Sequence, residues 1–342
     1  MNSQMRGSVR PAISVLVLAA LLVLSGAPHT AAEPGAHVAS RTPGSGQSVE
    51  ISVYSPSMNR NIPLQVLRPA ETGIPAPTLY LLNGAGGGED SATWPAQTDV
   101  AEFFADKHVN VVIPLEGAFS YYTDWQHPDE GLAETLENNG RNMWATFLTE
   151  ELPPLIDATF GTTGANALAG ISMAATSVLD LTIRAPELYR AAAAYSGCAM
   201  TSDPLGQTFV TLVISLGGGD PENMWGPTGG EGWRQRDPYL QAHRLPDIPM
   251  YISSGTGLPG RYDTLDNPRL NDDNKKLWNQ ILVGGGIEAV TDYCTRALAR
   301  RTQELGRTNI VYDIRPTGTH SWGYWESDLH RSWPLLAAAM GV

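Results

Sequence analysis

The apolar positions alternate strictly near the start of the chain and later gather into short runs. Residues 48–55 and 61–68 alternate apolar, often β-branched side chains with polar ones, and a turn-like Pro56-Ser57-Met58-Asn59 separates them. This pattern predicts an opening antiparallel hairpin. Strands are predicted at residues 78–82, 109–113, 165–170, 249–253 and 309–314. The first two are short apolar runs and are expected to be buried. Residues 191–195 and 211–216 are further short apolar runs.

Helical periodicity fills most of the stretches between these runs. It predicts helices at residues 98–107, 142–158, 172–184, 286–305 and 325–340. Pro153 and Pro154 are expected to start a new turn within the second of these. Strands that alternate with helices indicate an α/β fold with a mainly parallel central sheet and helices on both faces. Residues 217–232 and 255–274 are rich in Gly, Pro, Asp and Asn and predict long, functional loops.

The first 32 residues have the pattern of a secretion signal. Arg6 and Arg10 precede the apolar run 11–24, and a small-residue site ends at Ala32. The alternative is an uncleaved membrane anchor, but the run is shorter than the roughly 20 residues that span a bilayer. We therefore expect an exported protein of the cell envelope or medium, without an integral span after cleavage. Residues 33–47 predict a flexible lead-in, and residues 48–342 a single catalytic domain.

Composition and charge narrow the class of partner. Apolar residues make up 42% of the 342-residue chain, which is enough for a substantial core. Removing the signal takes away two arginines and no acid, so the net charge moves from −13 to −15. Such a surface disfavours nucleic acid and anionic membranes as main partners. Neutral substrates are unaffected, and the sequence does not indicate an oligomeric state.

Two cysteines, Cys198 and Cys294, are present. In an exported chain a pair is most simply one disulfide, and the alternative is two buried free thiols. Their spacing fits no metal site, and no HExxH motif or paired histidine cluster occurs. We expect neither a metal ion nor another cofactor.

A candidate nucleophile lies between a predicted strand and a predicted helix. Gly170-Ile171-Ser172-Met173-Ala174 has the spacing of a nucleophile elbow, with Ala174 where glycine is usual. The backbone N–H of Met173 would lie at the helix N-terminus, where it can donate to an oxyanion. The alternative is that Ser172 is an ordinary helix N-cap.

A serine nucleophile needs a histidine base oriented by a carboxylate. His320 is the best candidate because it follows the last predicted strand, in the order Ser, acid, His that α/β hydrolases use. His330 sits in a predicted helix beside Arg331 and is expected at the surface. Many acids lie between Ser172 and His320. Glu288 and Asp292 begin the long helix after three glycines, and either could be only a capping acid.

Several stretches together resemble the antigen 85 mycolyltransferase family, within the esterase D-like branch of α/β hydrolases. The resemblance covers residues 50–340, and its last stretch is the most specific. The matching stretches are Tyr80-Leu-Leu-Asn-Gly84, Tyr122-Thr-Asp-Trp125, Gly170-Ile-Ser-Met-Ala-Ala175, Met224-Trp-Gly-Pro227 and Gly318-Thr-His-Ser-Trp-Gly-Tyr-Trp325.

The resemblance implies roles for individual residues. It implies a triad of Ser172, Glu288 and His320, with an oxyanion hole from the N–H groups of Ala85 and Met173. It implies substrate contacts from a second set of residues: Asn83, Gly84, Gly86, Trp225, Ser321 and Trp322. A Cys198–Cys294 bridge would then tie the helix of the acid to the sheet near Ser172. The substrates implied are trehalose mycolates and cell-wall glycans such as arabinogalactan.

The chain departs from the family in its first loop. Asn83 stands where the family has Asp, and Ala85-Gly86-Gly87-Gly88 replaces a bulkier segment containing an Arg. That loop touches sugar in the family, so we expect a relative of the corynebacterial type with shorter mycolates. Two alternatives remain: a secreted carboxylesterase that uses water as acceptor, and a non-catalytic cell-wall binding module.

Overall fold

The computed structural model describes residues 35–342, which belong to one compact unit. Within this range nine strands form one sheet in the order β1-β2-β3-β5-β4-β6-β7-β8-β9. The first three pair antiparallel, β3 also pairs antiparallel with β5, and the remaining pairs are parallel. The strands are β1 (His37–Pro43), β2 (Ser48–Ser55), β3 (Arg60–Leu67), β4 (Thr78–Leu82), β5 (Asn110–Pro114), β6 (Asn166–Ile171), β7 (Tyr189–Tyr195), β8 (Met250–Ser254) and β9 (Ile310–Ile314).

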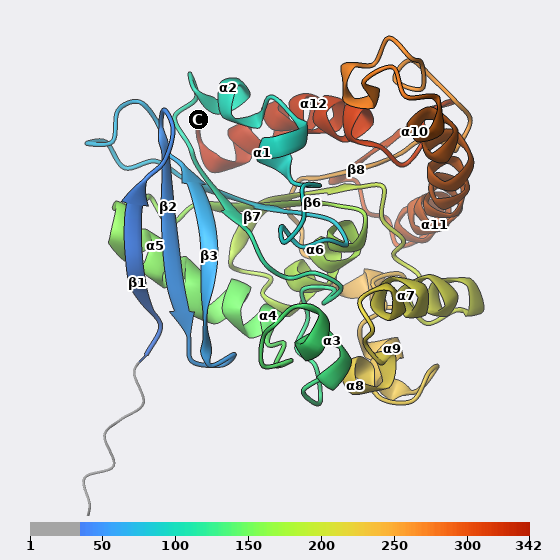
Figure 1. The fold of residues 1–342 in the computed structure, drawn as a ribbon, viewed down its shortest axis with the longest axis horizontal. Coiled ribbons are helices and arrows are strands. Elements are labelled where there is room, and N and C mark those ends of the chain that lie inside the picture. Colours follow the sequence, from blue (N-terminus) through green and yellow to red (C-terminus); the bar gives the residue numbers. More distant parts are fainter. Residues whose placement is uncertain (1–34) are drawn as a thin grey trace, which may run out of the picture. The chain divides into compact units, whose positions relative to one another are not determined.

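Helices cover both faces of the sheet (Figure 1). The α-helices are α1 (Trp94–Gln97), α2 (Val100–Phe104), α3 (Glu130–Thr135), α4 (Trp144–Thr146), α5 (Leu152–Phe160), α6 (Met173–Arg184), α7 (Pro204–Leu216), α8 (Pro221–Trp225), α9 (Glu231–Gln235), α10 (Asn274–Asn279), α11 (Gly285–Glu304) and α12 (Trp322–Met340). Short π- and 3₁₀-helical segments are η1 (Phe147–Glu151), η2 (Ala242–Arg244), η3 (Pro268–Leu270) and η4 (Gln280–Gly284).

Two apolar cores lie on opposite faces of the sheet, because successive side chains of a strand point to opposite sides. In β4, Leu79 and Leu81 pack with α1, α2 and α12, whereas Tyr80 and Leu82 pack in the core of α5 and α6. The carboxyl ends of the central parallel strands are thereby fixed beside one another. Binding sites of α/β sheets lie at this edge.

The predicted α/β class and mainly parallel sheet are confirmed, and the hairpin is β2 and β3. The flexible lead-in is wrong for part of its range. Residues 37–43 form β1, which pairs with β2, so the compact unit begins before residue 48. Isolated Gly and Pro obscured the strand in the sequence. The predicted signal segment lies outside the described residues.

Two other segments differ in detail from their patterns. The expected helix at 142–158 is divided into α4, η1 and α5, and Pro153 does lie in the first turn of α5. The apolar run 211–216 is the last part of helix α7, and short helices interrupt both predicted loops. None of the helices within residues 35–342 is long and apolar enough to span a membrane.

Candidate active site

Ser172 occupies a strained turn between β6 and α6. Its φ of 55° and ψ of −122° lie where few non-glycine residues are found, as a nucleophile elbow requires. Gly170 permits this turn, because a Cβ there would lie 2.9 Å from the Cβ of Ala174. The Ser172 N–H donates to the carbonyl of Tyr195, which fixes the turn to the end of β7. Ser172 makes no side-chain cap bond to α6, which argues against the N-cap alternative.

Ser172, His320 and Glu288 form one hydrogen-bonded chain. The His320 Nε2 lies 2.8 Å from Ser172 Oγ, and its Nδ1 lies 2.8 Å from Glu288 Oε2. The Glu288 side chain is fully buried and that of His320 is 9% exposed. The distances suit a neutral histidine that donates from Nδ1 to the carboxylate and accepts the serine proton at Nε2. The three residues that the resemblance implied therefore meet in the fold.

The second oxygen of Glu288 is held by groups that the sequence analysis did not identify. Ser196 Oγ donates to Glu288 Oε1 over 2.8 Å, and the Gly255 N–H donates over 2.6 Å. Both residues directly follow a central strand, β7 or β8. Polar residues at the carboxyl ends of buried strands were the signal that could have found them.

The predicted disulfide is present. Cys198, in the loop after β7, is bonded to Cys294 on α11, six residues beyond Glu288. No free cysteine occurs in the described range. The bridge joins the helix that carries Glu288 to the loop that carries Ser196, so both sides of the Glu288 contact are cross-linked.

The glycine-rich loop after β4 supplies the second part of the predicted oxyanion hole. The Phe119 N–H donates to the carbonyl of Ala85 (2.8 Å), while the Ala85 N–H has no acceptor within the described chain. A Cβ on Gly84 would lie 3.4 Å from that of Ser172, so the loop passes directly beside the nucleophile. Met173, the first residue of α6, has no intrahelical acceptor for its N–H. Both N–H groups are thus available for an oxyanion.

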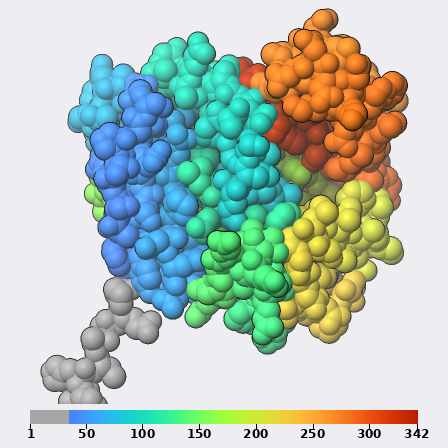
Figure 2. Space-filling model, viewed as in Figure 1, coloured from blue at the N-terminus to red at the C-terminus, as the bar shows by residue number. Residues whose placement is uncertain are grey.

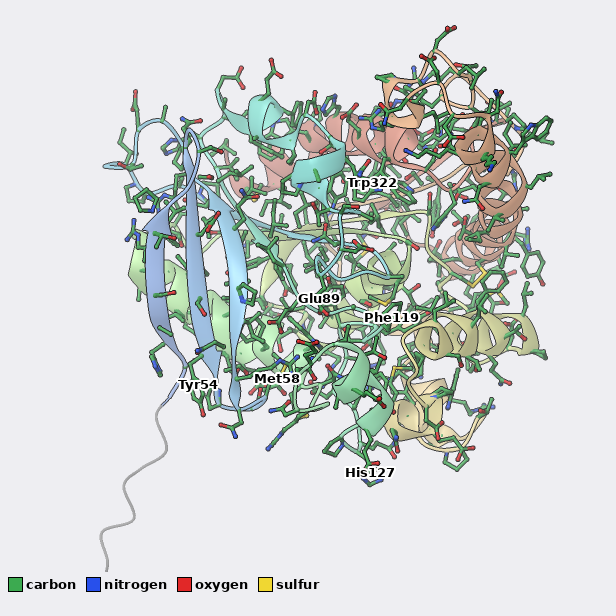
Figure 3. All side chains as sticks on the ribbon, viewed as in Figure 1. Tyr54, Met58, Glu89, Phe119, His127 and Trp322 are labelled. Atoms are coloured by element: carbon green, nitrogen blue, oxygen red, sulfur yellow. A yellow bond between two sulfur atoms is a disulfide. The ribbon has the colours of Figure 1, made fainter. Side chains whose placement is uncertain are left out.

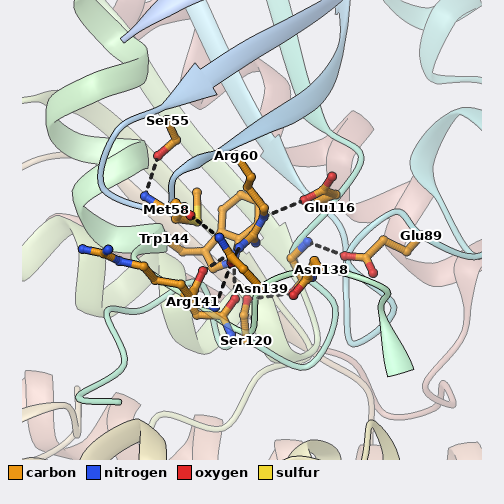
Figure 4. A network of polar contacts seen from close by, with 12 residues as sticks. Ser55, Met58, Arg60, Glu89, Glu116, Ser120, Asn138, Asn139, Arg141 and Trp144 are labelled. Atoms are coloured by element: carbon orange, nitrogen blue, oxygen red, sulfur yellow. Dashed lines mark hydrogen bonds and ion pairs between the residues drawn. The ribbon is translucent and has the colours of Figure 1, made fainter. Parts of the chain in front are cut away.

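The carboxylate of Glu89 and the side-chain amide of Asn83 hold this loop in place. Glu89 Oε1 accepts from the N–H groups of Gly117 and Ala118. The network continues to Glu116, which accepts from Arg60 Nε (Figure 4). Burial raises the pKa of Glu116, and Arg60 opposes that rise. The loop therefore has a fixed backbone before substrate arrives.

Asn83 has a structural role instead of the expected sugar contact. Its side chain is fully buried; Nδ2 donates to the carbonyls of Gly87 and Pro114, and Oδ1 accepts from the Trp94 N–H. The Gly86 carbonyl accepts from the N–H groups of Gly88 and Glu89, so it is also used within the loop.

Trp225 is also a core residue. It is 5% exposed, packs against Trp233 and Tyr121, and lines neither hollow beside Ser172. The structure thus places Trp225 in the core and outside both hollows, and the substrate contact expected from it stays a prediction. Its place in a conspicuous Met-Trp-Gly-Pro stretch did not distinguish packing from binding.

Two hollows of different chemistry meet at His320, and Figure 2 shows a depression between the orange, yellow and teal segments. The first is a narrow apolar pocket of about 60 Å³ between α7 and α11. It opens directly on Ser172, and its apolar walls include Phe209, Val213 and Val290. Tyr121 also lines it, and burial raises the pKa of the Tyr121 hydroxyl, so this wall stays uncharged.

The second hollow is larger and polar, with a volume of about 340 Å³. Ser321 and Trp322, which the resemblance implied, lie on its wall, and Trp322 packs edge-on against Trp94 (Figure 3). The sequence analysis missed three residues with amide side chains that line it, namely Asn267, Asn279 and Gln280. The Asn267 amide and the Gln280 Nε2 are bonded within the protein, which leaves Asn279 and the Gln280 Oε1 for a ligand. Amides and an indole suit a hydroxyl-rich ligand.

The described residues contain no cluster of three or more His, Cys, Asp or Glu side chains that could hold a metal ion. A hydroxyl, a base, a buried acid and two free N–H groups can carry out acyl transfer through a covalent serine ester. An apolar pocket on one side and a polar hollow on the other suit an amphiphilic ester.

Comparisons with known proteins agree with this chemistry. Residues 55–336 match the Esterase family, described as "Putative esterase". The chain is 31% identical to the diacylglycerol acyltransferase/mycolyltransferase Ag85A of Mycobacterium tuberculosis, over 85% of this chain and 81% of that protein. The chain belongs to the antigen 85 family. It is also 29% identical to Ag85C of Mycobacterium leprae, over 82% of this chain and 78% of the relative.

Solved structures give the same family and fold. M. tuberculosis MPT51 (FbpC1) is 26% identical, with a TM-score of 0.67 over 84% of this chain and 96% of that one. The fluorophosphonate-binding serine hydrolase FphF of Staphylococcus aureus is 17% identical, with a TM-score of 0.57 over 86% and 99%. The latter likeness shows the fold alone. This antigen 85 relative is therefore an acyl-transferring enzyme with the α/β-hydrolase fold.

Proposed function

We propose that the protein is an exported mycolyltransferase that moves a mycolyl group between trehalose esters through an acyl-Ser172 intermediate. The observation that carries the proposal is the position of His320, which lines both the apolar pocket and the polar hollow. One base can then serve an acyl chain on one side and a sugar on the other. The names of the mycolyltransferase relatives supply the class of acyl group and support trehalose mycolates as substrates.

In the first half-reaction, His320 Nε2 takes the Ser172 proton as Oγ forms a bond to the ester carbonyl carbon. The N–H groups of Ala85 and Met173 stabilise the negative oxygen. The ester C–O bond then breaks, and His320 returns the proton to the departing trehalose oxygen. Glu288 holds the histidine tautomer throughout.

In the second half-reaction, a sugar hydroxyl gives its proton to His320 and attacks the acyl carbonyl. The bond between the acyl carbon and Oγ then breaks, and His320 gives the proton to Oγ, which regenerates Ser172. The acceptor is a second trehalose monomycolate or the arabinogalactan of the cell wall. Trp322 and Asn279 of the polar hollow would hold this sugar.

Only the start of the acyl chain fits the narrow pocket. Its volume is only about 60 Å³. A long chain would continue over the surface of α7, which has no charged side chain and leaves Leu212 and Leu216 exposed. The uncharged surface of α7 could contact the rest of a long acyl chain, which favours a long-chain substrate over a short-chain one.

Export is part of the proposal. It rests on the signal pattern of residues 1–32, and the Cys198–Cys294 disulfide supports it because such bonds persist in oxidising compartments. Western blotting of cell fractions from the native host would test it. Retention in the cytoplasm would contradict it.

The proposal is tested with purified protein, trehalose monomycolate as donor and labelled trehalose as acceptor. Wild type should form labelled mycolate ester, and Ser172→Ala should form none while keeping the same unfolding midpoint. Retained activity in Ser172→Ala would overturn the assignment of the nucleophile.

The second candidate is a secreted carboxylesterase, which shares all of the chemistry except the acceptor. The polar hollow is open enough for water to reach His320. Water could therefore take the place of the sugar as acceptor, which favours this second candidate. Release of free acid that does not fall as trehalose is added would favour the esterase and contradict the transferase.

A further inference from the structure

Asp263, in the long loop before α10, gathers hydrogen bonds from four separate segments. It is 6% exposed. Its Oδ1 accepts from Thr319 Oγ1 (2.5 Å) and Gln280 Nε2 (2.7 Å). Its Oδ2 accepts from Tyr324 Oη (2.7 Å) and the Gly260 N–H (2.7 Å). Its own loop, the histidine turn, η4 and α12 thus meet at one carboxylate.

Two of these bonds lead directly to the catalytic histidine. Thr319 is fully buried and immediately precedes His320. Gln280 begins η4, and the carbonyl at the end of η4, on Gly284, accepts from the His320 N–H (3.2 Å). Asp263 therefore fixes the backbone of His320 from both sides, without touching its ring.

The remaining two bonds, from Tyr324 and the Gly260 N–H, hold the segments that pack against the His320 turn. Tyr324 packs behind Gly318, where a Cβ would lie 3.1 Å from the tyrosine ring, and Gly318 exchanges backbone bonds with the Asp263 loop. The Gly318 N–H donates to Leu258, and its carbonyl accepts from the Gly257 N–H. Movement of the loop would therefore move the turn.

A carboxylate is the group that these four donors require. The hydroxyls of Thr319 and Tyr324 can reverse and accept, but the Gln280 amide and the Gly260 N–H can only donate. Each oxygen of Asp263 faces one hydroxyl and one obligatory donor. An asparagine would leave one obligatory donor without an acceptor in either orientation of its amide.

We propose that Asp263 is a positioning residue for catalysis, which holds the His320 turn so that Nε2 stays within hydrogen-bond distance of Ser172 Oγ. The proposal rests on the triad of the proposed function but not on its acyl donor or acceptor. Small displacements of a catalytic group can cost about 10²-fold in rate. Asp263 would therefore affect the rate of attack by Ser172 more than it affects folding.

The test compares Asp263→Asn with a matched control, Asp129→Asn. Asp129 is also buried (2% exposed) and accepts from the N–H groups of Leu132 and Asp220 and from Asn223 Nδ2. It joins α3 to α8 and lines neither hollow. Both variants lose the same kind of bond, so they report the same structural cost at different places.

The first readout is the rate at which a fluorophosphonate labels Ser172, per folded molecule. Asp263→Asn should be about 10–100-fold slower than wild type, and Asp129→Asn within about twofold of it. The second readout is the low-field proton NMR signal of the His320 Nδ1–H, which Asp263→Asn should shift or broaden. Equal labelling rates in the two variants, or an unchanged NMR signal in Asp263→Asn, would overturn the proposal.

Thr319→Val keeps the test valid if Asp263→Asn fails to fold. It removes one hydroxyl and should slow labelling about 10-fold; labelling at the wild-type rate would overturn the proposal. Labelling requires no mycolate or trehalose, so the two proposals can fail separately. Wild-type protein that is labelled at Ser172 but transfers no mycolate would contradict the proposed function alone.

Discussion

Ser196 Oγ donates a 2.8 Å hydrogen bond to the Glu288 oxygen that His320 leaves free. Ser196→Ala removes this bond while leaving the buried backbone donor of Gly255. Loss of one hydrogen bond to a charged group, about 1.5–3 kcal/mol, should lower kcat by about 10-fold or more with little change in KM. Steady-state kinetics of acyl transfer measure this. An unchanged kcat would show that the remaining donors to this oxygen, the Gly255 N–H and Ser254 Oγ, are sufficient to hold the carboxylate.

Glu288→Gln tests the acid itself. The glutamine can fill the same buried space, but it presents an amide to His320 and no longer fixes the productive tautomer. We expect kcat to fall by about 10³–10⁴-fold, as in other serine triads. Thermal unfolding near the wild-type midpoint serves as the control for folding. A loss below tenfold would assign the acid to another residue.

Asn83→Asp introduces the residue that the family resemblance implies at this position, and it should destabilise this protein. The carboxylate would face the carbonyl oxygens of Gly87 and Pro114, to which Asn83 Nδ2 now donates. Two lost donations and a buried repulsion should reduce the free energy of unfolding by about 2–4 kcal/mol. Urea denaturation gives the value. Tighter binding of trehalose by this variant, without loss of stability, would contradict the structural role of Asn83.

The disulfide should matter for both stability and rate. Replacing Cys198 and Cys294 by alanine together should lower the free energy of unfolding by about 2–4 kcal/mol. Fluorophosphonate labelling of Ser172 should slow as well, because the bridge joins the segments of Ser196 and Glu288. Equal urea midpoints for the oxidised protein and the double variant would count against this expectation.

Stability should also depend on pH through Asp328, which is fully buried on α12 and receives a 2.8 Å bond from Ser253 Oγ. Burial raises its pKa from 3.8 to about 6, against the opposing effect of Arg315. The folded protein therefore holds this proton more tightly than the unfolded chain does. The resulting stability is fully present below about pH 4 and is lost as the pH rises through about 6, a change of about 3 kcal/mol.

Urea denaturation between pH 4 and pH 7 measures this dependence. Asp328→Asn should remove its share of the slope, because the neutral amide has no proton to lose in this pH range. Parallel stability curves for the variant and the wild type would exclude Asp328 as the titrating group.

Local sequence patterns predicted most of the helices and strands, and they also predicted Ser172 as the nucleophile and His320 as the base. The central strands gave clear apolar runs. Ser172 directly follows the buried strand β6, and His320 lies in a turn of recognisable composition after the half-buried strand β9. The helix of Glu288 was also evident, but its choice over neighbouring acids came from the family resemblance. Geometry then brought the three together over sequence separations of 32 and 148 residues.

The supporting contacts could not be predicted, because they join residues whose local sequences carry no sign of a partner. Ser196 reaches Glu288 across 92 residues, and Asp263 reaches Thr319 across 56. The run 211–216 was ambiguous because an uncharged amphipathic helix and a buried strand share a composition. Asn83 was misjudged since a buried amide and a ligand-binding amide look identical in sequence.

His320 stands at the border of the two hollows, and this has a consequence for the order of events. Under the proposed function the lipid tail stays on its own side of the border during the whole cycle, while small sugars exchange on the other. The departing sugar and the incoming one would use the same entrance, so the first must leave before the second arrives. The enzyme would thus keep the lipid bound at one place while sugars enter and leave beside it one at a time.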